Sequence, residues 1–151
     1  MRSMYLFFLV QNINRLLFAE DSKIEFIASQ VFSNSKLIEI TIPKSVKHIE
    51  EFAFSMCKFI QKVEFEQNSE LISISEFAFF NSSIPSIIIP QHVETISEGA
   101  FSSCDNLQFV DFSQNSELHS IEKEAFSASS IRSISIPSCV ENLYDGWCNL
   151  T

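Results

Sequence analysis

Apolar residues recur along this chain in short runs that alternate with polar residues. The runs share the form apolar-x-apolar and include Val63-x-Phe65, Ile87-x-Ile89, Val110-x-Phe112 and Ile134-x-Ile136. Alternation with a period of two predicts short β-strands that bury one face. A second recurring segment, Ile-x-x-x-Ala-Phe, lies between these runs. We expect it to cross the opposite wall of the fold as a helical turn or an irregular loop.

The runs belong to an internal repeat. Residues 44–90 laid on residues 91–137 give 26 identities in 47 positions without a gap. Each 47-residue block contains two similar halves of 22 to 25 residues. A unit of this size cannot bury its apolar face alone, whereas stacked units share one continuous core. The repeat therefore predicts a β-rich solenoid of about six units with a parallel sheet along one side.

Two positions in each unit have a clear physical role. The Phe of the Ala-Phe pair should fill the interior, while the Ala leaves room for a close backbone approach. We expect the following rings to stack as an interior ladder: Phe54, Phe79, Phe101 and Phe126. Proline follows alternate strands, where its missing N–H ends the strand pairing. These prolines are Pro43, Pro90 and Pro137.

The repeated motifs resemble those of the BspA-type leucine-rich-repeat family. The match rests on Ile-x-Ile-Pro-x-x-Val, the Ala-Phe pairs and the Ala-Phe-x-x-Cys runs, and it extends from Leu16 to Leu143. The resemblance implies a right-handed α/β superhelix with one parallel sheet. The family occurs on surface proteins of some bacteria and in parasitic protists, which favours a cell-surface or secreted location. A cytoplasmic location stays open.

We interpret residues 1–151 as one domain and as a piece of a longer array. Carrying the repeat backwards makes residues 1–18 a degenerate first repeat, with Leu6-Phe7 in the Ala-Phe position. The apolar run Met4–Val10 has an alternative interpretation as a short signal peptide. Residues 138–151 form an incomplete last repeat, in which Trp147-Cys148 takes the place of Ala100-Phe101.

Charge and glycine content exclude several functions. Ten Lys+Arg against 19 Asp+Glu give a net charge of −9, which argues against nucleic acid and anionic membranes as partners. Only two glycines occur, too few for a phosphate-binding loop. Met4–Val10 is too short to span a bilayer, so we expect no membrane insertion by this chain.

The cysteines do not suggest a metal site. Cys57 and Cys104 occupy the same position two units apart, hence ~9.5 Å from each other, whereas a disulfide needs Cα atoms within ~7 Å. They are interpreted as small buried hydrophobic residues. A Cys139–Cys148 bridge stays open in an oxidising compartment. No CxxC pair is present, so no zinc site is predicted.

No catalytic group or cofactor site is predicted either. The three histidines, His48, His92 and His119, fall at different repeat positions. The carboxylates, including Glu50-Glu51 and Glu122/Glu124, are spread along presumed loops, and a short solenoid offers no obvious cleft for them. The sequons at Asn81 and Asn149 matter only in a secretory pathway. We expect a non-enzymatic binding module.

The outward strand positions are the candidate binding surface. They should form an exposed ladder in which Phe109 and Ile88 provide the one apolar spot. An aromatic anchor ringed by polar groups is typical of an interface, although isolated surface hydrophobic residues are common. The candidate partner-binding residues are Lys62, Glu64, Ser86, Ile88, Phe109, Asp111, Ser133 and Ser135. The expected function is recognition of a protein or glycan in an adhesin-like role. The alternative is an intracellular scaffold.

Overall fold

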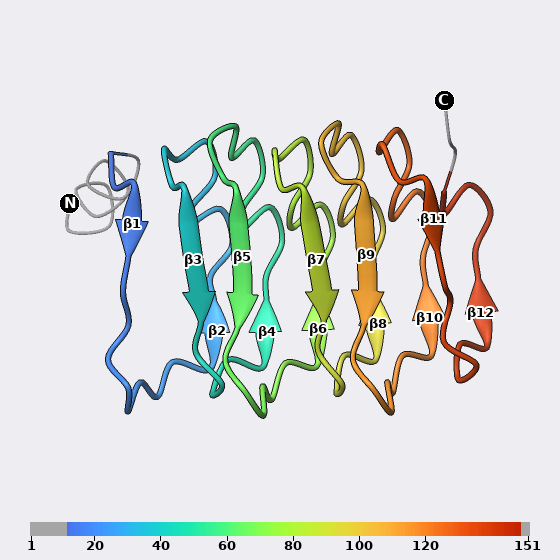
Figure 1. Cartoon of the computed structure of the whole chain (residues 1–151), viewed down its shortest axis with the longest axis horizontal. Helices are drawn as coiled ribbons and strands as arrows, with labels where there is room; N and C mark the ends of the chain where they lie inside the picture. The colour runs from blue at the N-terminus through green and yellow to red at the C-terminus, as the bar shows by residue number, and fades with distance from the viewer. Residues whose placement is uncertain (1–11, 149–151) are drawn as a thin grey trace.

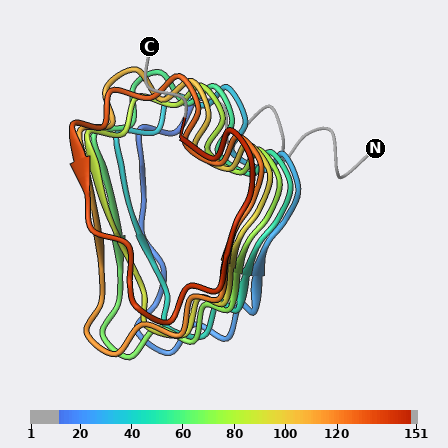
Figure 2. The ribbon, with the colours of Figure 1, turned by 90° about the vertical axis from the view of Figure 1, so that its right-hand side faces the viewer.

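Short strands, one on each of two opposite walls in every turn, wind the chain into a stack of similar turns (Figures 1 and 2). The computed structural model describes residues 12–148. The predictions for Met4–Val10, including the placement of Leu6-Phe7 in a first repeat, lie outside the described residues, as does Asn149. Within the described range the chain is a parallel β-solenoid.

The front wall consists of two three-stranded parallel sheets. The first has the order β1-β3-β5 and the second the order β11-β9-β7. The strands are β1 (Arg15–Leu16), β3 (Glu39–Ile42), β5 (Lys62–Phe65), β7 (Ser86–Ile89), β9 (Phe109–Phe112) and β11 (Ser133–Ile134). Alternate residues, such as Ile40, Val63 and Ile87, are buried. The alternation predicted from the sequence is therefore present.

The back wall is also a parallel sheet, which the sequence analysis did not predict. Its six strands have the order β12-β10-β8-β6-β4-β2. They are β2 (Phe26–Ile27), β4 (His48–Ile49), β6 (Ser73–Ile74), β8 (Thr95–Ile96), β10 (Ser120–Ile121) and β12 (Asn142–Leu143). Between residues 12 and 148 there is no helix. The structure thus does not support the α/β assignment or the single sheet.

The backbone conformation explains why the Ala-Phe segment forms an arch and not a helix. In one arch Phe52, before Ala53, has φ 55°, and Met56, two residues after Phe54, has φ 58°. A right-handed helix needs consecutive residues at negative φ, and only three lie between these two left-handed positions. The same pairs recur in other turns at Gln30 and Asn34, Phe77 and Asn81, Gly99 and Ser103, and Glu124 and Ala128.

The interior aromatic ladder is confirmed. Phe54, Phe79, Phe101 and Phe126 have no exposed surface, and successive rings stack with centroids 5.0–5.2 Å apart. Phe32 extends the stack at one end, 5.1 Å from Phe54. At the other end the Trp147 ring meets Phe126 edge-on at 6.3 Å. One aromatic column therefore runs through the core of successive turns.

Corners of two lengths alternate where the front wall leads into the back wall. The short corners hold three residues, 43–45 and 90–92, between the last strand residue and the next buried apolar residue. The long corners hold five, 66–70 and 113–117. Asn68 and Asn115 adopt φ 58° and 59° in the long corners, a conformation that asparagine tolerates well. Along this edge the turns therefore protrude and recede alternately.

Gly99 leaves room for the Phe77 ring at a left-handed position of its arch. Its φ is +61°, and a Cβ atom there would lie 2.3 Å from a ring carbon of Phe77. Gly99→Ala should lower the free energy of unfolding by about 1–2 kcal/mol, because alanine disfavours the left-handed conformation and the Phe77 ring must move. Chemical denaturation measures the change. Glu124→Ala is the matched control, because residue 124 holds the equivalent left-handed position with a side chain already present. Equal losses in both variants would contradict the prediction.

Candidate binding surface

The predicted partner-binding residues all lie on the front wall or just beyond β11. Their side chains point outward, because they occupy the strand positions between the buried ones. Phe109 and Ile88 have 61% and 60% of their surface exposed, so their predicted exposure is confirmed. Asp111, Ser133 and Ser135 are also exposed.

Strand register sets the geometry of the apolar spot. Phe109 lies opposite Ser86 on one neighbour and Ser133 on the other, whereas Ile88 lies opposite Asp111. Phe109 and Ile88 are therefore diagonal neighbours, for which a separation of about 7–8 Å is typical, and not direct neighbours at about 5 Å. The spot is a diagonal pair with a polar residue beside each member.

A further exposed apolar side chain stands on the same wall. Leu17, directly after β1, is 75% exposed. The expectation that Phe109 and Ile88 form the one apolar spot on the ladder is therefore wrong. Leu17 follows β1, which belongs to the sheet β1-β3-β5, while Ile88 and Phe109 lie on the other three-stranded sheet. The two apolar positions are thus separate features.

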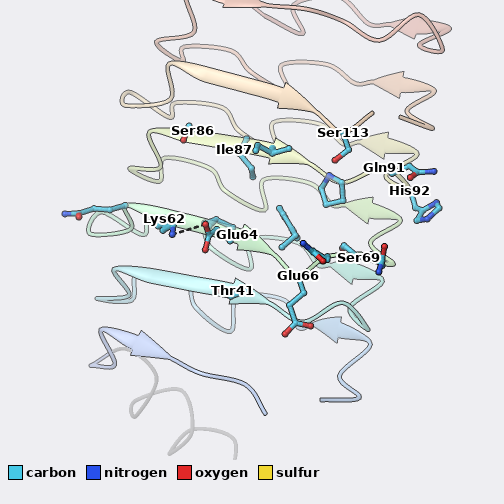
Figure 3. Close-up of a pocket in the computed structure, with 17 residues that line it drawn as sticks. Thr41, Lys62, Glu64, Glu66, Ser69, Ser86, Ile87, Gln91, His92 and Ser113 are labelled. Carbon is cyan, nitrogen blue, oxygen red and sulfur yellow. Dashed lines mark ion pairs between the residues drawn. The ribbon is translucent and has the colours of Figure 1, made fainter. Parts of the chain in front are cut away.

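Lys62 and Glu64 lie together on β5. Lys62 Nζ is 2.8 Å from Glu64 Oε1, and Figure 3 marks this ion pair. The hydrogen bond that Lys62 donates to the Glu64 carboxylate raises the pKa of Lys62 above its usual value. About half of each side chain is exposed to solvent, so this ion pair adds little to the stability of the fold. It presents one positive and one negative group to a partner.

A groove separates these two residues from the apolar spot, and sequence analysis missed it. β5 and β7 are not paired, so the front wall is interrupted between them (Figure 1). The groove there has a volume of about 680 Å³ (Figure 3). Its walls include Lys62 and Glu64 from β5, Ser86 and Ile88 from β7, and corner residues from both sides. Four of the eight predicted residues thus line it.

The alternating corners shape one end of the groove. Its lining there comes from the long corner after β5, from Ser113 at the start of the next long corner, and from the short corner of Pro90, Gln91 and His92. The short corner therefore lies in the groove between two longer ones. The sequence contains a signal that could have located this hollow. The two halves of the 47-residue block differ in length, and both short corners begin with a proline, Pro43 or Pro90.

A polar contact holds the short corner in place. His92 Nδ1 is 3.0 Å from Glu117 Oε2, and Gln91 Nε2 donates to the other oxygen of Glu117 at 3.4 Å. The hydrogen bond with His92 lowers the pKa of Glu117. On the back wall, His48 Nδ1 lies 2.9 Å from Ser73 Oγ. These contacts are structural, and they bring together no nucleophile with a base and an orienting acid.

The cysteines form part of the packing between turns. Cys57 Sγ donates to the Phe32 carbonyl at 3.0 Å, and Cys104 Sγ donates to the Phe79 carbonyl at 3.1 Å. Both are fully buried, as predicted. Cys139 and Cys148 are partly exposed, and all four thiols are free. Burial raises the pKa of Cys57 and raises that of Cys104 to about 11.

The raised thiol pKa predicts a loss of stability at alkaline pH. Below the ordinary value of 9.0 the Cys104 thiol is protonated in both the folded and the unfolded chain, so stability is unaffected. Between about pH 9 and 11 the unfolded chain loses its proton first, and the free energy of unfolding should fall. Denaturation curves across this range measure the slope. Cys104→Ala should reduce the slope, and an unchanged slope would contradict the assignment.

Residues 12–148 present neither a metal site nor a membrane-spanning helix. No group of three or more His, Cys, Asp or Glu side chains is arranged to hold a metal ion there. That range likewise has no helix with the length and apolarity needed to cross a membrane.

The stacked turns, their buried ladder and their exposed parallel strands define the class: a leucine-rich-repeat solenoid. Residues 25–148 match the BspA type leucine rich repeat region in six copies. The chain belongs to the BspA-type leucine-rich-repeat family, as its motifs indicated.

Solved structures show the same architecture. The pneumococcal vaccine antigen PcpA aligns with a TM-score of 0.78 and 29% identity, over 83% of this chain and 33% of that chain. A leucine rich cell surface protein of Faecalibacterium prausnitzii aligns with a TM-score of 0.52 and 23% identity, over 80% of this chain and 39% of that one. A leucine-rich repeat protein of Eubacterium ventriosum has a TM-score of 0.52 and 20% identity, over 84% and 49%. These two show the fold alone.

The chain spans a third to a half of the length of these proteins. A comparison with curated protein sequences gives no significant match.

Proposed function

We propose that this chain is a non-enzymatic recognition module that binds a protein or glycan on its front wall. The observation that carries the proposal is the exposure of Phe109, 61% of whose surface faces solvent on a regular strand. The corresponding positions on neighbouring strands hold Ser86 and Ser133. The core does not need an aromatic ring at this position, whereas an interface uses one.

The surroundings of Phe109 suit an interface. Ile88 on β7 adds apolar area diagonally opposite Phe109. Asp111 lies on β9, two residues after Phe109. Lys62 and Glu64 supply opposite charges across the groove. Typical interfaces have such an apolar centre within a polar rim, and most of the binding energy comes from a few central residues. We take Phe109 as that centre, with Ser86, Ser133 and Ser135 around it.

An adhesin-like role at the cell surface or in secreted form is the leading proposal. The supporting observations are the family and one structural neighbour, which is named a vaccine antigen. An intracellular scaffold is the second candidate. Its support is the four free thiols, because disulfides form in secreted proteins more often than in cytosolic ones. Surface biotinylation of intact cells would separate the two.

Binding to arrayed ligands tests the proposal. The labelled chain is applied to immobilised extracellular proteins and glycans, and retained spots are tested again with Phe109→Ala and Phe26→Ala. Phe26 is 54% exposed on the back wall and is the matched control. We expect Phe109→Ala alone to lose the signal. No retained ligand, or equal losses in both variants, would contradict the proposal.

A further inference from the structure

The backbone of β5 turns unpaired groups towards β7. In a parallel ladder the N–H and C=O of one residue face the same neighbouring strand, and successive residues face opposite sides. Glu66 N–H donates to the Ile42 carbonyl at 3.0 Å, so the alternate residues 62, 64 and 66 face β3. The backbone N–H and C=O groups of Val63 and Phe65 therefore point towards β7. No ladder of hydrogen bonds joins β5 to β7.

The backbone of β7 does the same from the other side. The Ile89 carbonyl accepts from Ser113 N–H at 3.0 Å, which directs Ile89 and alternate residues of β7 towards β9. Ser86 and Ile88 consequently direct their N–H and C=O groups towards β5. The groove thus has peptide donors and acceptors along both of its edges, and each of them gains by finding a polar partner.

The width of the interruption excludes an inserted peptide strand. A strand paired to both edges would hold β5 and β7 about 9.5 Å apart, twice the usual spacing of about 4.8 Å. Cα atoms of β5 and β7 instead approach within 8 Å of each other. A ligand must therefore lie over the groove. It can form hydrogen bonds with the peptide groups at the edges of β5 and β7, but it cannot join the sheet as a strand.

The groove side chains are mainly amides, hydroxyls and carboxylates. An amide such as that of Gln61 or Gln67 both donates and accepts, and a carboxylate such as that of Glu66 accepts only. Sugar hydroxyls also donate and accept, so they match this mixture and the alternating peptide groups. The volume of about 680 Å³ is within the usual range for small-ligand sites.

The charge and the neighbouring apolar residues narrow the ligand further. Glu64 and Glu66 line the groove, and Asp111 stands beside Ile88, so carboxylates outnumber the single lysine, Lys62. This excess repels anionic ligands. Ile88, on the edge of the groove, and the diagonal Phe109 offer apolar area against which the C–H face of a sugar ring can pack.

We infer that the groove between β5 and β7 binds a neutral oligosaccharide, with one sugar packed against Ile88 and Phe109. This inference rests on the proposed front-wall recognition function and names the class of its ligand. The sugar hydroxyls bond to the edges of β5 and β7 and to the glutamines of the groove. Sialylated and sulfated glycans are excluded by the carboxylates.

An array of neutral, sialylated and sulfated oligosaccharides tests the ligand class. We expect neutral members to be retained, and calorimetry with a retained oligosaccharide to show tenfold or greater weakening for Ser86→Trp, which fills the groove. The melting temperature should stay unchanged, because residue 86 points outward from β7. Asn142→Trp, at an exposed position on β12, is the control and should bind normally. The double variant Gln61→Ala/Gln67→Ala, which removes two groove amides without adding bulk, should also weaken binding.

The other outcomes overturn the inference. Retention of sialylated or sulfated members alone, or neutral binding that neither groove variant weakens, would show that the groove is not the site. The chain could instead retain proteins but no oligosaccharide, and lose that protein binding in Phe109→Ala. This result would refute an oligosaccharide as the ligand and leave the proposed recognition function standing. Retention of neither class would refute both.

Discussion

Replacing Phe101 by alanine should lower the free energy of unfolding by about 3–5 kcal/mol, the usual range for a buried phenylalanine. Its ring has no exposed surface and stacks between Phe79 and Phe126 at 5.1 and 5.2 Å. Removing it opens a cavity in the middle of the column and breaks contacts with two turns at once. Urea denaturation measures the loss. Small domains are stable by only about 5–15 kcal/mol, so this variant should be close to unfolding.

Phe59→Ala is the control for the core substitution. Its ring is 58% exposed, so its removal should change the free energy of unfolding by less than about 0.5 kcal/mol. If Phe101→Ala were equally mild, the column would not hold the turns together. If Phe59→Ala were equally severe, the assignment of the inner and outer faces in that arch would be wrong.

Replacing Phe109 by alanine should weaken ligand binding by about 2 kcal/mol or more, roughly 30-fold, as expected for an aromatic hot spot. Stability should stay nearly unchanged, because a ring that is 61% exposed contributes little to folding. Both quantities must be measured on the same variant, the affinity by calorimetry and the melting temperature by a thermal scan. Their separation distinguishes a binding residue from a core residue.

Two results would contradict this prediction. A large fall in melting temperature would mean that the ring supports the fold. Unchanged affinity with unchanged stability would move the binding site to the arches or the back wall. Phe26→Ala, which removes a similarly exposed ring from β2, should leave both affinity and stability close to those of the unchanged chain.

The features predicted from the sequence are those that depend only on repeat register. Burial of Phe54 and exposure of Phe109 both follow from the period-two alternation and the fixed repeat, and both are confirmed. The back wall could not be predicted in the same way. Each of its strands has two residues, and every strand except β12 buries one of them, such as Ile49 or Ile74. One buried residue is too short a pattern to show alternation.

The sequence of the arches also did not show their backbone conformation. Left-handed positions usually hold glycine or asparagine, yet here Phe52 and Phe77 occupy two of them. Their rings stack at 5.2 Å, and this contact between turns offsets part of the backbone strain. A contact between residues 25 positions apart leaves no local pattern, so the sequence could not distinguish the arch from a helical turn.

The candidate site was predicted in part. Outward positions follow from alternation, but the interruption between β5 and β7 does not, because it depends on which strands pair and how closely. The diagonal placement of Ile88 and Phe109 likewise depends on strand register. Only the unequal lengths of the two half-repeats hinted at a hollow beside the short corner.

Hydrogen–deuterium exchange tests most directly whether the front wall is the binding surface. The ligand is one that the chain retains in the array experiment described above. Exchange is measured on the chain with and without the ligand that it retains. We expect slower exchange in peptides that cover β5, β7 and β9, with the largest change at Ser86–Ile89 and Phe109–Phe112. Exchange in the back-wall strands β4, β6 and β8 should be unchanged. Protection confined to the back wall or the arches would contradict a binding surface centred on Phe109.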